Sequence, residues 1–249
     1  MERTLHTILL FSFLIIFGKL QAQQSDELVD YEYFESDYLE TAPINIFEFG
    51  VKYILPQGAF KRYRNGRNFG GANISFLRQL KGDSPFFIKG NFDFAVQDSY
   101  SSPVKRIVNF FEEDWDAQTV SYVLTFGIGV RYYPPMLGFW RIDPFVELNS
   151  GFNWFLTSTY FSRLGGDETE SIIEGGQLAY YLGSSAGFNV KISDAFFLLI
   201  KISYNQGLAA DYYVRNDVAQ AFFSSFEAFD KRRSATDMLN FCLGISYAF

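Results

Sequence analysis

Large apolar residues alternate with small or polar residues along much of the chain, most clearly in its last eleven residues. In Leu239–Phe249 every odd-numbered position is large and apolar, while the even-numbered positions hold Asn, Cys, Gly, Ser and Ala. A period of two is typical of a β-strand with two different faces. A strand that crosses a bilayer needs about 9–11 residues, so this segment is long enough. We expect its large residues to face lipid and its small residues to face a narrow interior.

The same pattern predicts seven further strands. We expect them at residues 44–55, 68–80, 86–97, 119–133, 144–157, 177–192 and 196–205. Pro134 and Pro135 end the fourth, because proline cannot donate to a strand ladder. The connections alternate in length, and the long ones cover residues 56–67, 98–118, 158–176 and 206–237. Bacterial outer-membrane barrels have short periplasmic turns and long outward loops, so an even strand count puts both termini in the periplasm.

These observations predict an all-β protein. Its residues 44–249 form an eight-stranded antiparallel transmembrane up-and-down β-barrel. The alternative is a soluble β-sandwich, in which Phe126, Ile128 and Val130 would pack inside against a second layer. In the barrel, the same three side chains lie on the outside.

The start of the chain predicts a targeting segment. Arg3 precedes an apolar run from Ile8 to Phe17, and Ala22 offers a small residue for cleavage. This is the pattern of a secretory signal peptide, and the run is too short to span a bilayer. We assign residues 1–22 to the signal peptide and residues 23–43 to an acidic periplasmic lead-in. The lead-in is either a solvated segment or a docking tail for a basic partner.

The terminal strand also carries a family resemblance. Its assembly signal resembles that of bacterial outer-membrane β-barrels, which end in an aromatic residue after alternating apolar positions; here these are Leu243, Ile245, Tyr247 and Phe249. The motifs at residues 55–58, 131–134 and 193–194 resemble the outer-membrane β-barrel domain proteins of Bacteroidota, small barrels of the OmpA transmembrane-domain and OmpX kind. The resemblance implies location in the cell outer membrane and assembly by the barrel-assembly machinery.

Charged residues recur at positions expected to face the barrel interior. They are Glu48, Lys52, Lys89, Asp93, Arg131, Glu147, Lys191 and Lys201. Because an unpaired buried charge is very costly, we expect charges of opposite sign to pair. The resulting ionic network is either a polar plug that fixes strand register, or a gate in a narrow path.

The expected long loops carry three distinctive groups of residues. The first loop, residues 56–67, is basic, and its basic side chains either contact lipopolysaccharide phosphates or are merely solvated. These side chains are Lys61, Arg62, Arg64 and Arg67. The third is acidic but lacks calcium-loop spacing, so no metal site is assigned. In the fourth, apolar spacing predicts a short amphipathic helix over Asp217–Asp230. Its aromatic face would cap the barrel mouth, lie on lipid or meet a partner: Phe222, Phe223, Phe226 and Phe229.

Composition argues against enzymatic chemistry. The only histidine is His6, inside the expected signal peptide, whereas enzymes of this membrane generally use histidine as acid or base. Removing residues 1–22 takes away one acid and two bases, which changes the formal charge from −7 to −8. Cys242 is the only cysteine, so it cannot form an internal disulfide.

We therefore predict a non-enzymatic barrel with a structural or surface-interaction role and no cofactor. Its expected partners are outer-membrane lipid, lipopolysaccharide and the assembly machinery, with another outer-membrane protein as a further candidate, and no nucleic acid. The alternatives are an accessory subunit of a secretion or uptake complex, or a narrow small-solute transporter.

Overall fold

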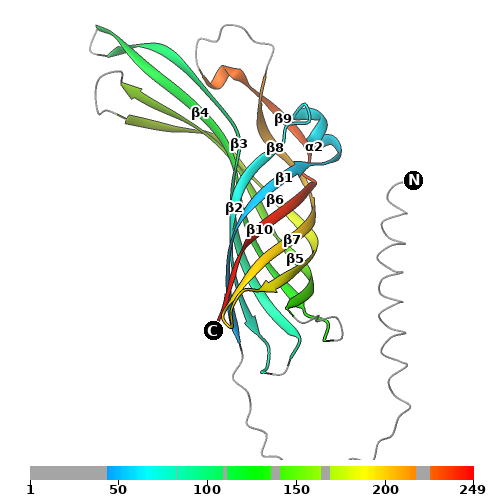
Figure 1. The fold of residues 1–249 in the computed structure, drawn as a ribbon. Coiled ribbons are helices and arrows are strands. Elements are labelled where there is room, and N and C mark those ends of the chain that lie inside the picture. The colour runs from blue at the N-terminus through cyan, green and yellow to red at the C-terminus, as the bar shows by residue number, and fades with distance from the viewer. Residues whose placement is uncertain (1–43, 83, 109–110, 136–140, 164–168, 217–224) are drawn as a thin grey trace, which may run out of the picture. The chain divides into compact units, whose positions relative to one another are not determined.

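Eight strands form a closed antiparallel barrel. The computed structural model describes residues 44–82, 84–108, 111–135, 141–163, 169–216 and 225–249, so the expected signal peptide and lead-in lie outside the described residues. The barrel strands are β1 (Asn45–Pro56), β2 (Phe69–Gln79), β3 (Phe86–Val108), β4 (Phe111–Tyr132), β5 (Ile142–Arg163), β6 (Thr169–Lys191), β7 (Phe196–Gly207) and β10 (Met238–Ala248). Their order around the ring is β1-β10-β7-β6-β5-β4-β3-β2 (Figure 1). The predicted up-and-down barrel is confirmed.

The outside of the barrel is apolar. Phe126, Ile128 and Val130 are 46%, 71% and 45% exposed. Polar side chains at the alternate positions along the strands are buried and point inward. A closed barrel pairs its backbone groups within the ring and can therefore cross a bilayer. Outward-facing aromatic pairs lie at the end that holds Asn45 and Phe249, with ring centroids 4.8 Å apart for Phe86–Tyr132 and 5.0 Å apart for Phe196–Tyr247. The soluble sandwich alternative is wrong.

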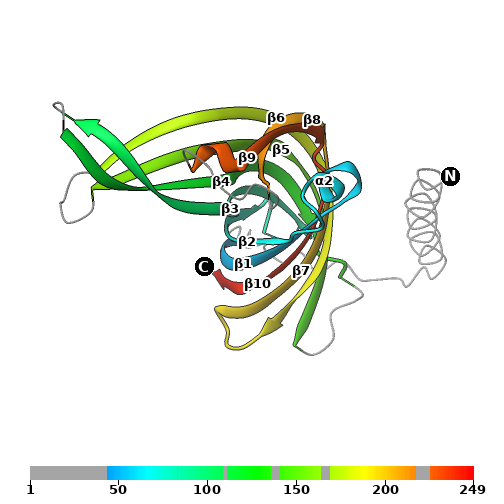
Figure 2. The same ribbon diagram turned by 90° about the horizontal axis from the view of Figure 1, so that it is seen from above.

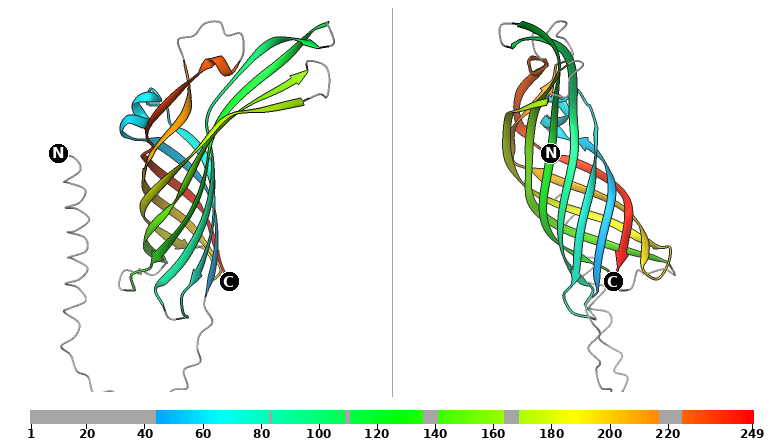
Figure 3. Two further views of the ribbon diagram at one scale, coloured as in Figure 1. Left: turned by 180° about the vertical axis from the view of Figure 1, so that it is seen from behind. Right: turned by 90° about the vertical axis from the view of Figure 1, so that its left-hand side faces the viewer.

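Four strands continue beyond the barrel. β3 pairs with β2 only up to Val96, and β6 pairs with β7 only from Tyr181 onward. Past these residues β3, β4, β5 and β6 pair with one another alone. We call this four-stranded part the outward sheet: residues 98–108, 111–121, 157–163 and 169–180. Figures 2 and 3 show it reaching away from the ring, and in Figure 3 it lies at the end opposite the C-terminus.

The expected loops 98–118 and 158–176 are thus mostly strands, and the sequence-based boundaries were wrong there. The strands were missed because the outer face of the outward sheet is polar. On β4, Asp114 and Gln118 are exposed, while Trp115 and Ala117 between them are buried. The period of two persists, but the outer face becomes polar because this part of the sheet faces water instead of lipid.

The fourth connection forms a hairpin of β8 (Ala209–Arg215) and β9 (Phe229–Ala235). Residues 217–224 of the expected helix lie outside the described residues. The rest is not α-helical: Phe226–Ala228 form the 3-10 helix η1, and Phe229 begins β9. Cross-strand ion pairs favour the hairpin, with Asp211 lying 3.0 Å from Lys231 and 3.3 Å from Arg233.

The first connection holds α2 (Gly58–Tyr63). No helix among the described residues is both long and apolar enough to cross a membrane.

We predict that Gly151→Ala lowers the free energy of unfolding by about 1–3 kcal/mol, the usual cost of overpacking. A Cβ at Gly151 would overlap the Phe126 carbonyl oxygen of the neighbouring strand, so the backbone would have to move. Gly90→Ala is the matched control, since nothing lies within 4 Å of its Cβ position. Urea unfolding in lipid vesicles measures both, and equal midpoints for the two variants would contradict the prediction.

Candidate functional site

An ionic layer fills the barrel interior at the end that holds Asn45 and the C-terminal Phe249. The Arg131 guanidinium donates to both carboxylate oxygens of Glu48, at 2.6 and 2.9 Å, and through Nε to Glu147 at 2.7 Å. Lys89 Nζ donates to both Glu147 oxygens at 3.0 and 2.9 Å, and Lys201 Nζ lies 3.8 Å from Glu147. All five side chains are buried. They come from β1, β3, β4, β5 and β7, so the layer ties together five of the eight strands.

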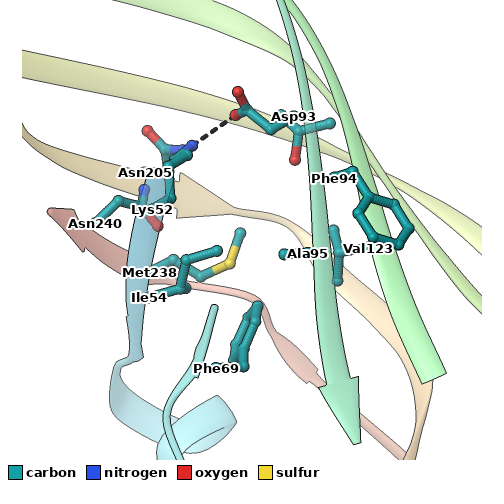
Figure 4. A pocket seen from close by; sticks show the side chains of 11 residues that line it. Lys52, Ile54, Phe69, Asp93, Phe94, Ala95, Val123, Asn205, Met238 and Asn240 are labelled. Carbon is teal, nitrogen blue, oxygen red and sulfur yellow. Dashed lines mark hydrogen bonds and ion pairs between the residues drawn. The ribbon is translucent and has the colours of Figure 1, made fainter. Parts of the chain in front are cut away.

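Two of the remaining expected interior charges form a separate pair farther along the barrel. Lys52 lies 2.6 Å from Asp93 (Figure 4). Asp93 also accepts a hydrogen bond from the Asn73 amide. Lys191 does not belong to the interior, which corrects the prediction for this residue. It is the last residue of β6, and its half-exposed side chain lies 2.8 Å from Asp194 in the following turn.

An apolar layer closes the opposite end of the interior. Phe60 of α2 is fully buried, with its ring centroid 4.8 Å from that of Tyr212 on β8 and 6.0 Å from that of Phe155 on β5. Val214 of β8 and Met238 belong to the same cluster. The β8–β9 hairpin and α2 therefore fold onto the mouth of their own barrel.

Little space remains between the two layers. The cavity there measures about 10 Å³, and Figure 4 shows Lys52, Asn205, Asn240 and Met238 among the side chains around it. This is about the size of one water molecule. The described residues thus favour the plug interpretation of the ionic network over the gate.

The basic residues of the first connection have divided roles. Arg64 is fully buried, donates to the Gln97 carbonyl at 2.8 Å, and lies 3.2 Å from the Asp98 carboxylate. Burial lowers the pKa of Arg64, and the Asp98 carboxylate opposes that shift. Arg67 lies 3.4 Å from the same carboxylate. These two arginines join the first connection to β3. Because Arg64 is buried, it cannot contact lipopolysaccharide as expected. Lys61 and Arg62 are exposed, and for these two residues the lipopolysaccharide contact stays a prediction.

The expected aromatic face of the fourth connection is also divided. Phe222 and Phe223 lie outside the described residues. Phe226 is half-buried, with its ring centroid 5.1 Å from that of Tyr213, and Phe229 is buried. Phe229 therefore belongs to the packed hairpin and offers no face to a partner.

The terminal strand closes the ring. Leu243, Ile245, Tyr247 and Phe249 are all exposed on the outside. The backbone groups of Phe249 and Asn45 exchange two hydrogen bonds of 2.9 Å. Cys242 points inward and is buried beside Phe145 and Leu199. The role of the terminal residues in assembly stays a prediction.

The outward sheet holds surface features that the sequence analysis missed because it assigned this region to loops. Ile172 and Ile173 on β6 are 47% and 72% exposed. Glu174 and Gly175 follow them beside a cavity next to β8. A Gly-Gly pair inside an alternating segment, at residues 175–176, was the signal that could have revealed a strand irregularity there.

Solved structures are similar to this chain over most of its length. Neisserial surface protein A has 11% identity, with 82% of this chain and 97% of that chain covered and a TM-score of 0.44. A major outer membrane protein from Thermus thermophilus has 13% identity, coverage of 82% and 99%, and a TM-score of 0.43. The outer membrane protein OprG from Pseudomonas aeruginosa has 15% identity, coverage of 84% and 97%, and a TM-score of 0.42. No protein-family model and no curated protein sequence matches.

Within the described part of the chain, no group of three or more His, Cys, Asp or Glu side chains is placed to hold a metal ion.

We predict that Arg131→Met destabilises the barrel by about 3–5 kcal/mol, because it leaves Glu48 and Glu147 without their main counter-charge. Lys105→Met is the control, since its ion pair with Glu112 is exposed and worth at most about 1 kcal/mol. Urea unfolding of both variants in lipid vesicles gives the comparison. If the two variants unfold at the same urea concentration, the ionic layer does not stabilise the fold.

Proposed function

We propose that this protein is a non-enzymatic integral β-barrel of the Gram-negative outer membrane, with both termini in the periplasm, and that its outward sheet binds an extended segment of another protein. The signal-peptide pattern in residues 1–22, the apolar exterior and the aromatic terminal strand support this location. The resemblance to Bacteroidota barrel proteins predicts a source organism in that group, and this stays a prediction.

The two edges of the outward sheet differ, and this difference carries the proposal. The β3 edge is protected: Arg64 donates to the Gln97 carbonyl at 2.8 Å, Arg215 donates to the Ser99 carbonyl at 3.4 Å, and Pro103 has no N–H to offer. Such devices are how natural sheets prevent unwanted strand pairing.

Over residues 169–176 the β6 edge has no comparable protection among the described residues. Over Thr169–Gly176 its pairing is with β5 alone, and the exposed Ile172 and Ile173 lie within this stretch. Beyond it, Gln177 and Tyr180 bond to Asp211 and Leu208 at the start of the hairpin. An open edge with apolar side chains is suited to addition of a strand from a partner.

The closed interior argues against the transporter alternative. The ionic and apolar layers fill both ends of the interior, and the cavity between them measures about 10 Å³, which is about the size of one water molecule. A strand acceptor on the outward sheet fits either a free-standing surface protein or a subunit of a larger outer-membrane complex.

We expect that peptides selected from a displayed library on the purified barrel in nanodiscs bind by strand addition to β6. Ile173→Ser should weaken them about tenfold or more, since burying an isoleucine contributes about 1.5–3 kcal/mol. N-methylation of the amides along one peptide edge should abolish binding, while methylation along the other edge should not.

Tyr160→Ser is the control for this experiment, because Tyr160 is 44% exposed but lies on the central strand β5. Equal loss of binding for the two variants, or indifference to N-methylation on both edges, would show that strand addition to β6 is not the binding mode.

We also expect no discrete conductance steps from the wild-type protein in planar bilayers, because both layers close the interior. An open porin reconstituted in the same bilayers serves as the positive control. Reproducible steps from the wild-type chain would instead favour the narrow small-solute transporter.

A further inference from the structure

A pocket of about 380 Å³ lies between β6 and the β8–β9 hairpin, beside the open edge of the outward sheet. The residues that matter here are Glu174, Gly175 and Gln177 of β6, Asp211 and Tyr213 of β8, and Lys231 of β9. Its volume falls in the range of small-molecule sites. Phe155 and Tyr212 of the apolar layer also line the pocket, whereas the six residues just named belong to neither closing layer.

An irregularity in β6 builds this pocket. Thr157 pairs with Gly175 and Ser158 pairs with Ile173, so Glu174 is an extra residue with no partner across the strand pair. Bulges of this kind re-aim a side chain. At the same point a Cβ on Gly175 would lie 2.8 Å from the Tyr213 ring. Glycine therefore lets the Tyr213 ring lie directly against the backbone of β6.

Hydrogen bonds hold the opposite side of the pocket in place. The Asp211 amide donates to the Gln177 side-chain oxygen, which fixes the start of β8 against β6. The Asp211 carboxylate lies 3.0 Å from Lys231 and 3.3 Å from Arg233. The hydrogen bond from Lys231 lowers the pKa of Asp211, so this carboxylate is ionised and already neutralised by its neighbours.

Glu174 differs from Asp211 in having no counter-charge. Its half-buried side chain has neither an ion pair nor a hydrogen bond with any other described residue. The other acidic residue on this part of β6, Glu170, is 2.7 Å from Arg106. Glu174 is therefore the carboxylate of this pocket that remains available to a ligand.

We propose that the pocket binds a guanidinium group, supplied by an arginine side chain of the strand that docks on β6; this rests on the proposed function. Glu174 pairs with the guanidinium, whose planar fork suits a carboxylate, and the Tyr213 ring in the pocket wall supplies an aromatic neighbour for the cation. In strand addition the backbone supplies affinity and side-chain pockets supply specificity, and this pocket adjoins the docking edge.

The test uses n-butylguanidinium as the probe and the intact barrel in nanodiscs, with binding measured by calorimetry. The neutral isostere n-butylurea is the matched ligand control. We expect saturable binding of the cation, at least about tenfold weaker binding of the urea, and about tenfold weakening of the cation by Glu174→Gln. Glu174→Asp should retain part of the affinity, and added salt should weaken binding.

Two further variants separate charge from shape. Gly175→Ala keeps every charge but displaces the Tyr213 ring, so it should also weaken binding of n-butylguanidinium. Glu112→Gln removes an exposed carboxylate of the outward sheet that pairs with Lys105, and it should have no effect. Circular dichroism confirms that each variant is folded.

Equal binding of the cation and the urea, or unchanged binding by Glu174→Gln, would overturn the proposal. The two experiments together also distinguish failure of the guanidinium pocket from failure of the proposed strand docking. If n-butylguanidinium binds through Glu174 while selected peptides ignore Ile173→Ser, the pocket takes a small free cation and strand docking fails. If arginine-free peptides dock through Ile173 and the probe does not bind, strand docking stands and the guanidinium pocket is wrong.

Discussion

Every backbone N–H and C=O group within a bilayer must find its partner inside the protein, because lipid offers none. The chain meets this constraint by pairing its first described strand with its last. The hydrogen bonds between Asn45 and Phe249 are where the ring closes. Once it is closed, alternate side chains must face either lipid or a narrow interior. The apolar exterior, the small inward residues and the need to pair interior charges all follow from that closure.

The interior is filled in two different ways. At the end that holds the C-terminus, Arg131 and its partners form a layer whose members come from five barrel strands. A register slip of one residue would turn Glu48 toward lipid, so this layer favours a single alignment of the strands. At the other end, Phe60 and Tyr212 come from connections between barrel strands. That layer can change without altering strand register, which leaves the outward end free to vary.

The barrel could be predicted from the sequence because its outer face is uniformly apolar, as Phe126, Ile128 and Val130 illustrate. The pairing of Glu48, Arg131 and Glu147 was also predictable, since strand direction places these residues at one level. The outward sheet was not, because its outer face is polar and the apolar signal stops where the lipid stops. The β8–β9 hairpin was missed for another reason: the helical spacing of Phe222, Phe226 and Phe229 is local, whereas the pairing of Asp211 with Lys231 joins residues far apart in the chain. The predicted lipopolysaccharide contact was wrong for Arg64 on similar grounds, because its acidic partner, Asp98, lies on a different strand and outside residues 56–67.

Because Cys242 points into the barrel, the reactivity of its thiol reports whether the ring has closed. This single thiol is buried next to Phe145 and Leu199, in the strand that completes the ring. A maleimide reagent can reach it only before the last strand has joined its two neighbours. Loss of thiol labelling over time therefore follows the burial of Cys242 as the ring closes, and no cysteine has to be engineered into the protein.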